Sequence, residues 1–223
     1  GLTRNLTAGE MLSQIYQIQK DTKERVSNII VMGMGEPLDN YEELLRFIKL
    51  VSCEKGIGIS QRNITVSTCG LVDKIRMLAD EKLQITLAIS LHAPNDEIRR
   101  QTMPIANRYT IGEIIQACKY YFDKTGRRIT FEYSMIRGVN DKEEHAKELA
   151  GRLSGLNCHI NLIPLNEVKE RNCYRSTKED IEKFKSILEK YRKTVTIRRE
   201  MGSDIDAACG QLRKKFLTKN GRN

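Results

Sequence analysis

Six short runs rich in β-branched residues alternate with longer segments of helical periodicity along this chain of 223 residues. The runs recur at intervals of roughly thirty residues, and segments of about ten or more residues separate them. Strands and helices that alternate in this way form βαβ units, in which the strands are parallel and the helices cover the sheet. The predicted strands are residues 27–32, 63–66, 84–89, 128–136, 158–163 and 194–197.

Several helix-like segments begin with the pattern of a capping box, in which a Ser, Thr or Asn is followed three residues later by Glu. We expect the first residue of each pair to cap the helix by accepting a hydrogen bond from a backbone N–H of its first turn. The pairs are Thr7 with Glu10, Asn40 with Glu43, Thr110 with Glu113, Asn140 with Glu143, and Ser176 with Glu179.

The alternation runs through the whole chain without a linker rich in Pro, Gly or Ser. We therefore expect residues 1–223 to form one α/β domain, with residues 167–175 as a long loop. The parallel sheet either closes as a barrel or stays open as a doubly wound fold, and the periodicity leaves both open.

Charge and cysteine content narrow the function classes. The chain carries 38 Lys and Arg against 29 Asp and Glu, a net charge of +9 that favours a polyanionic partner such as RNA. No apolar run approaches the ~18 residues of a membrane span, and no signal peptide opens the chain, so we expect a cytoplasmic protein. The six cysteines include no CxxC pair, which argues against a zinc ribbon and against a small disulfide scaffold.

Polar and small residues follow the predicted strands where ligands bind in parallel α/β folds, at the carboxyl ends of the strands. They predict a site for a small polar ligand, although glycines in ordinary turns, local hydroxyl turns, a core histidine and a capping amide would explain them individually. The histidines have no spacing typical of a zinc site. The candidates are Gly35 and Glu36 after the first run, Ser67 after the second, Ser90 and His92 after the third, and Asn166 after the fifth.

Cys209 is the candidate reactive group, because small residues surround it and it follows a glycine turn after the last run. A buried structural thiol is the alternative, since free cysteine is among the most buried residue types. The nearby carboxylates of Asp204 and Asp206 argue slightly against a low thiol pKa.

Taken together, these motifs resemble the radical S-adenosylmethionine methyltransferases of the RlmN type, which methylate C2 of adenosine in 23S rRNA and tRNA. The resemblance covers nearly the whole chain and implies a radical-SAM barrel, of which this chain would hold a partial (βα)6 sheet. It is carried by Gly33-Met34-Gly35-Glu36-Pro37-Leu38, Ser67-Thr68, Ser90-Leu91-His92-Ala93-Pro94-Asn95, the segment 161–166 and the segment 204–212.

The resemblance also implies cofactors and residue roles. Cys209 would accept a methyl group from one S-adenosylmethionine, and a 4Fe-4S cluster fed by an external electron donor would cleave a second one. The resulting radical would activate the S-methyl group for addition to adenine C2. Gly35 and Glu36 would hold the methionine amino end, Ser67 and Ser90, Leu91 and His92 the sugar and carboxylate side, and Asn166 would complete the site.

The chain departs from the family pattern in one respect. The CxxxCxxC motif that ligates the cluster, and a second cysteine that resolves the RNA adduct, belong upstream of the segment matching Gly1, and no cysteine spacing here replaces them. We therefore expect a C-terminal fragment that lacks the first barrel strand, the cluster loop and an N-terminal RNA-binding domain, and that is inactive alone. Its unpaired first strand would favour self-association.

Two other functions remain compatible with the residues alone. One is a non-radical barrel enzyme such as an aldolase, although no lysine stands at a convincing strand end. The other is an RNA-binding module without catalysis.

Overall fold

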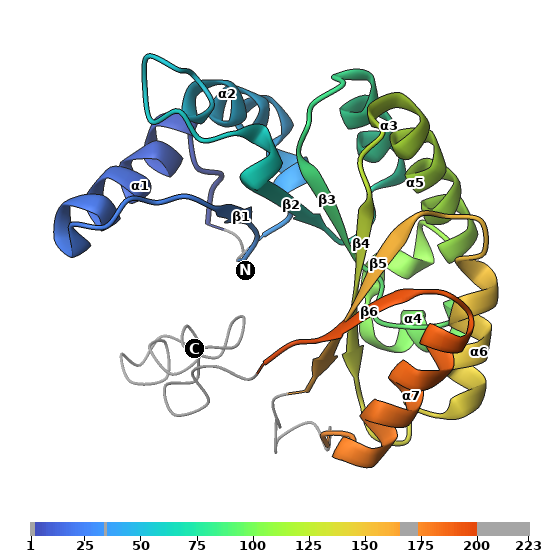
Figure 1. The fold of residues 1–223 in the computed structure, drawn as a ribbon. Helices are drawn as coiled ribbons and strands as arrows, with labels where there is room; N and C mark the ends of the chain where they lie inside the picture. Colours follow the sequence, from blue (N-terminus) through green and yellow to red (C-terminus); the bar gives the residue numbers. More distant parts are fainter. Residues whose placement is uncertain (1–2, 34, 166–173, 200–223) are drawn as a thin grey trace. The chain divides into compact units, whose positions relative to one another are not determined.

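The computed structural model describes residues 3–33, 35–165 and 174–199 of the chain. All six predicted strands are present, with ends within two residues of the predicted ones (Figure 1). The strands are β1 (Ile29–Val31), β2 (Ile64–Thr68), β3 (Thr86–Ser90), β4 (Ile129–Met135), β5 (Cys158–Pro164) and β6 (Thr194–Ile197).

Seven α-helices connect or precede these strands within the described residues. None of these helices is both long and apolar enough to cross a membrane. They are α1 (Ala8–Thr22), α2 (Tyr41–Val51), α3 (Val72–Asp80), α4 (Asp96–Thr102), α5 (Ile111–Thr125), α6 (Glu143–Arg152) and α7 (Lys178–Lys190).

The strands form one sheet in the order β1-β2-β3-β4-β5-β6, and the pairs β1–β2, β2–β3 and β5–β6 are parallel. A doubly wound sheet reverses its strand order at a switch point, whereas a barrel adds each strand next to the previous one. The sequential order therefore decides between the two predicted architectures in favour of the barrel type. In the described part of the chain the order ends at β1 and β6, so the sheet is open, and the expected α/β fold with a parallel sheet and outer helices is confirmed.

The chain divides into two compact units. Unit 1 comprises residues 1–89 and 113–129, and unit 2 comprises residues 90–112 and 130–223.

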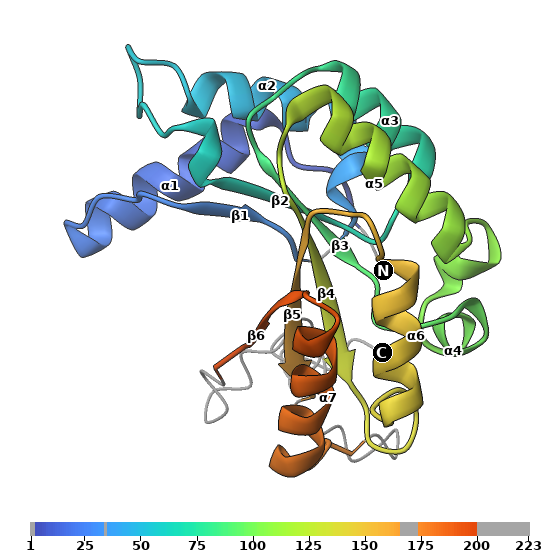
Figure 2. The same cartoon turned by 45° about the vertical axis from the view of Figure 1, so that its right-hand side comes forward.

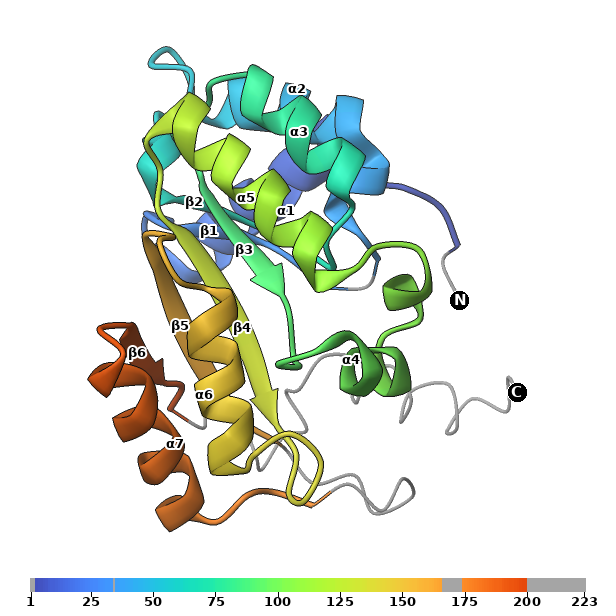
Figure 3. The same ribbon diagram turned by 90° about the vertical axis from the view of Figure 1, so that its right-hand side faces the viewer.

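In unit 1 the core is formed by buried apolar residues of α2, α3 and α5 together with those of β2 and β3. Figure 3 shows α3 and α5 side by side, and the hydroxyl of Tyr120 on α5 donates a 2.6 Å hydrogen bond to Asp80 at the end of α3. The buried Tyr121 donates to the backbone oxygen of Ile85, just before β3. These bonds hold α5 against α3 and the start of β3, although α5 begins only at Ile111 and β3 ends at Ser90.

Helix α1 has the capping box that its sequence predicts, but only part of its apolar set is buried. Its capping box is confirmed, because the Thr7 side chain accepts from the Glu10 N–H and the Glu10 carboxylate accepts from the Thr7 N–H. Ile15 is buried, but Tyr16 and Ile18 of the same apolar set are 55% and 51% exposed.

Unit 2 packs α6 and α7 on one face of its strands, and Figure 2 shows the two helices side by side. Alternate residues of β4 point to this face, and the buried Tyr133 meets Phe184 of α7 with ring centroids 5.3 Å apart. The intervening residues Glu132 and Ser134 therefore lie on the opposite face, because side chains alternate along a strand.

The helix caps predicted at Asn40, Asn140 and Ser176 are wrong, because each of these side chains binds a partner distant in the sequence. Asn40 makes no capping bond and donates to the backbone oxygen of Leu6, while its expected partner Glu43 accepts from the N–H of Ala8 at 2.6 Å. Asn140 lies before Lys142, the true N-cap of α6.

The cap of α7 is displaced by one residue from its predicted position. Thr177 accepts from the N–H of Asp180 and caps the helix, whereas Ser176 donates to the carboxylate of Asp141 at 2.7 Å.

Candidate functional site

Glu36 follows β1 and its carboxylate links two loops of unit 1. One carboxylate oxygen accepts from the N–H of Leu38 at 3.0 Å, and the other accepts from the N–H of Cys69, after β2, at 2.8 Å. Each carboxylate oxygen can accept a second hydrogen bond, and the side chain is only half-buried. Glu36 is therefore held in one orientation while it keeps acceptor capacity for a cationic ligand group.

The glycines before Glu36 shape the backbone of this loop. Gly33 and Gly35 have φ values of +127° and +138°, which L-residues with a side chain rarely adopt. Gly35 donates a 3.0 Å hydrogen bond to the oxygen of Gly33 and forms a tight turn. A substitution at Gly35 would strain this turn and shift the carboxylate that follows it.

Ser67 and Thr68 end β2 in the same unit, and the structure separates their roles. The Thr68 hydroxyl accepts from the N–H of Gly70, which is the local hydroxyl turn that was the alternative to ligand binding. Ser67 is 8% exposed and points to the other face of the strand. Within the part of the chain that the structure describes, no hydrogen bond engages the Ser67 hydroxyl, so of the two it is the candidate for a ligand.

In unit 2 the turn Ser90-Leu91-His92 follows β3 and is held by its backbone. The oxygen of Glu132 accepts from the N–H groups of both Leu91 and His92, at 3.1 and 3.2 Å. His92 has a left-handed φ of +57°, a conformation that costs a non-glycine residue roughly 1–2 kcal/mol. The surrounding hydrogen bonds offset this cost and fix the turn.

The imidazole of His92 has a defined protonation state. Its Nδ1 accepts a 3.0 Å hydrogen bond from the N–H of Ser134, so the proton of the neutral ring lies on Nε2. Burial, with smaller contributions from the positive charges of Arg99 and Arg198, lowers the pKa of His92 to about 4. Within the described residues Nε2 has no hydrogen-bond partner, so the ring offers a neutral N–H donor to a ligand.

Arg99 is a fully buried side chain that the sequence did not single out. From α4 it donates to three backbone oxygens, those of Leu91 at 3.2 Å, Ser90 at 3.4 Å and Tyr109 at 3.5 Å. Planar guanidinium groups suit such forked contacts, because they present several donors in a fixed geometry. Arg99 therefore stabilises the predicted ligand-binding turn through the backbone oxygens of Ser90 and Leu91.

Glu132 is a second residue that the sequence analysis missed. The residue is 8% exposed, and its carboxylate accepts from the Asn161 amide at 2.9 Å and from Arg198 at 3.4 Å. Burial raises the pKa of Glu132, and Arg198 and Asn161 oppose this shift. The alternation of β4 is the signal that could have found it, since Glu132 interrupts a run of apolar and aromatic residues.

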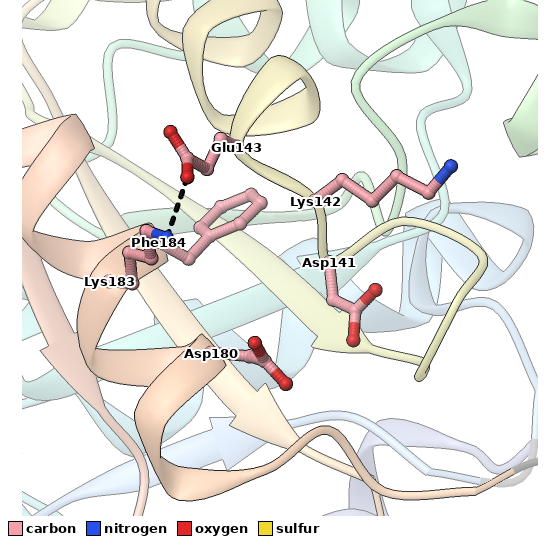
Figure 4. Close-up of a pocket in the computed structure, with 6 residues that line it drawn as sticks. All are labelled: Asp141, Lys142, Glu143, Asp180, Lys183 and Phe184. Carbon is pink, nitrogen blue, oxygen red and sulfur yellow. Dashed lines mark ion pairs between the residues drawn. The ribbon is translucent and has the colours of Figure 1, made fainter.

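One pocket of about 240 Å³ lies elsewhere in unit 2, at the start of α6 and α7 (Figure 4). An ion pair of 2.7 Å between Lys183 and Glu143 is part of its wall. None of the predicted site residues lines it. The lining residues are Asp141, Lys142, Glu143, Asp180, Lys183 and Phe184.

Two predicted site residues, Asn166 and Cys209, lie outside the described residues. The others are placed in two groups: Gly35, Glu36 and Ser67 at adjacent strand ends of unit 1, and Ser90, Leu91 and His92 in one turn of unit 2. No group of three His, Cys, Asp or Glu side chains that could hold a metal ion occurs in the part of the chain that the structure describes.

Comparison with known proteins identifies relatives along almost the whole chain. The chain is 60% identical over 98% of its length to the protein of Lachnoclostridium phytofermentans named probable dual-specificity RNA methyltransferase RlmN, 62% of which it covers. It is 61% identical over 97% of its length to the protein of the same name from Lachnospira eligens, again covering 62%. The chain thus spans less than two thirds of the length of these relatives.

A solved structure agrees with the sequence relatives. The crystal structure of a radical SAM methyltransferase from Sphaerobacter thermophilus matches 95% of this chain with a TM-score of 0.89 and 48% identity, and the match covers 63% of that protein. The sequence profile of the radical SAM superfamily matches residues 6–150, well over half of the chain. This chain therefore belongs to the radical SAM superfamily.

Proposed function

We propose that this chain carries the S-adenosylmethionine-binding part of an RNA methyltransferase that modifies C2 of adenosine in 23S rRNA and tRNA. The observation that carries the proposal is the identity of about 60% to proteins named dual-specificity RNA methyltransferase, extending over both groups of predicted site residues. Membership of the radical SAM superfamily removes the aldolase-type alternative. The net charge of +9 supports an RNA partner.

The residues at the strand ends fit S-adenosylmethionine chemically. The Glu36 carboxylate retains acceptor capacity for the methionine ammonium. The tight turn at Gly35 places backbone groups next to this carboxylate. The Ser67 and Ser90 hydroxyls and the Nε2–H of His92 suit the ribose and carboxylate oxygens. Leu91 holds the turn through its buried side chain, and Asn166 would complete the set. When bound, S-adenosylmethionine supplies the methyl group.

The residues described by the structure do not fit a 4Fe-4S cluster. The four described cysteines, Cys53, Cys69, Cys118 and Cys158, belong to no cluster of metal-ligating side chains, and the 223 residues contain no CxxxCxxC spacing. A cluster of the superfamily type would need ligands from outside these residues. We accordingly propose that the 223 residues alone bind no cluster and do not methylate RNA.

Cys209 is the proposed carrier of the methyl group between S-adenosylmethionine and RNA. Adenine C2 is a poor nucleophile, so a direct polar methylation of this carbon is unfavourable, whereas a cysteine sulfur accepts a methyl group readily. The two-stage route therefore gives a chemical reason for a cysteine in this part of the sequence.

The test is the mass of the tryptic peptide of residues 200–213, taken from the complete protein purified without oxygen from the cells that make it. We expect a fraction of the peptide to carry one additional methyl group on Cys209. The variant Cys209→Ala, prepared in the same way, should carry none and should leave adenosine C2 unmodified in 23S rRNA and tRNA. An unmethylated Cys209 that remains unmethylated after incubation with S-adenosylmethionine and a reductant would refute the proposed role of Cys209. RNA binding without any methylation would instead favour a non-catalytic module.

A further inference from the structure

Asn140 connects two strand ends of unit 2 through every hydrogen-bonding atom of its side-chain amide. The residue is 1% exposed. Its Oδ1 accepts from the N–H of Ile136 at 2.7 Å, and its Nδ2 donates to the oxygen of His92 at 2.9 Å and to the oxygen of Ser134 at 2.8 Å. One amide thus holds the turn after β3 at a fixed distance from the end of β4.

The distance that Asn140 fixes is the one across which Ser134 meets His92. The carbonyl oxygens bound by Nδ2 belong to these same two residues, and the N–H of Ser134 donates to Nδ1 of His92. The loop that carries Asn140 is itself anchored, because the buried Tyr133 hydroxyl donates to the Asn140 backbone oxygen at 2.7 Å. This amide therefore contributes to the geometry around the imidazole, together with the oxygen of Glu132 and the guanidinium of Arg99.

We propose that Asn140 is a positioning residue that locks the imidazole of His92 into its Nε2–H tautomer, so that Nε2 donates a hydrogen bond to an oxygen of the bound ligand. The proposal rests on the proposed function in one respect, since it takes S-adenosylmethionine, with its carboxylate and hydroxyl oxygens, as that ligand. Asn140 itself is buried, and its side-chain amide binds backbone groups of Ile136, His92 and Ser134.

The backbone groups of the turn are largely occupied by bonds within the protein. The N–H groups of Leu91 and His92 donate to the oxygen of Glu132, and the oxygens of Ser90 and Leu91 accept from Arg99. Among the described residues, the charged groups that lower the pKa of His92 are Arg99 from α4 and Arg198 after β6, and both disfavour a second proton on the ring. The neutral Nε2–H is therefore the donor that this turn presents across the physiological pH range.

The tautomer is measured directly in the complete protein labelled with 15N-histidine, by long-range 1H–15N correlation spectra, with the variant His92→Gln to assign the signals. We expect wild-type His92 to be a pure Nε2–H tautomer that stays neutral down to about pH 5. A proton on Nδ1 in the wild-type protein would overturn the proposal without any variant.

Asn140→Asp keeps the shape of the side chain but replaces its donor by an oxygen that faces two carbonyl oxygens. We expect a mixture of tautomers at His92 and a roughly tenfold rise in the Kd for S-adenosylmethionine, measured by equilibrium dialysis, which is the size of effect of one lost hydrogen bond. The matched control is Asn157→Asp, the same substitution at an exposed position of unit 2, which should change neither value.

A folded Asn140→Asp protein with the wild-type tautomer and Kd would overturn the positioning role. If that variant does not fold, Asn140→Ser serves instead, because a single hydroxyl cannot reach both carbonyl oxygens. If neither variant folds, the tautomer of wild-type His92 is the test: a proton on Nε2 supports the proposal, and a proton on Nδ1 overturns it. A wild-type protein that shows the Nε2–H tautomer but does not bind S-adenosylmethionine would refute the proposed function and with it the ligand contact, and it would leave the tautomer lock as a structural feature only.

Discussion

Replacing Arg99 by methionine should loosen the turn that carries His92. The substitution keeps a long unbranched side chain in a fully buried position but removes donors to the oxygens of Leu91, Ser90 and Tyr109. These bonds are long, between 3.2 and 3.5 Å, so we assign about 1 kcal/mol to each, below the usual range for charged donors. The expected loss is about 3 kcal/mol, or roughly a hundredfold in the equilibrium for local opening.

Hydrogen–deuterium exchange followed by mass spectrometry measures this opening peptide by peptide. Amides of residues 90–109 should exchange about a hundredfold faster in Arg99→Met than in the wild type, under conditions where reclosing outpaces exchange. The matched control is Arg100→Met, the exposed neighbour on the same helix, which should change stability by no more than about 0.5 kcal/mol. Equal exchange in the two variants would refute the reasoning, because it would mean that the buried guanidinium contributes nothing net to this turn.

Glu36→Gln should weaken S-adenosylmethionine binding in equilibrium dialysis and lower the unfolding free energy in urea by about 2 kcal/mol. The single amide oxygen of glutamine cannot accept from the N–H groups of both Leu38 and Cys69. Asp39→Asn, at an exposed position, is the control in both assays. Thr177→Ala should cost about 1 kcal/mol of stability in urea unfolding by removing the cap of α7, and an unchanged midpoint would contradict that assignment. The 223-residue chain should self-associate through the edge strand β1, where Ile30 is 58% exposed, so a monomeric light-scattering mass at all concentrations would disprove this expectation.

The strands were predictable because each is a short apolar, β-branched run, and such runs need no information beyond the local sequence. The Thr7 cap was predictable for the same reason, since both partners of its box lie within one turn. Helix α4, with seven residues, is too short to show a helical period and was missed.

The caps assigned to Asn40, Asn140 and Ser176 failed because the side chain of each has a partner that is distant in the sequence. The amide of Asn140 binds the oxygen of His92, which lies 48 residues earlier, and Ser176 binds Asp141, 35 residues earlier. A capping bond and a tertiary bond use the same donor and acceptor types, so the local pattern cannot distinguish them.

The candidate site was predictable in position more than in mechanism. Glu36 and His92 were selected because they follow strands, and the structure places them in the loops that follow β1 and β3. Arg99 was not predictable, because in the sequence it is one of two adjacent arginines and only the fold buries one of them. The tautomer of His92 depends on the N–H of Ser134, a backbone group that no residue pattern reveals.

Neither compact unit is a continuous stretch of chain, and this affects the order in which the protein can fold on the ribosome. Residues 113–129 belong to unit 1, yet they are synthesised after residues 90–112 of unit 2. Until α5 has left the exit tunnel, the oxygen of Ile85 lacks the hydroxyl of Tyr121, and the core of unit 1 lacks one of its helices. Residues 1–89 therefore remain incompletely packed until α5 is synthesised, and a chaperone or a pause in elongation would have its largest effect on yield in this interval.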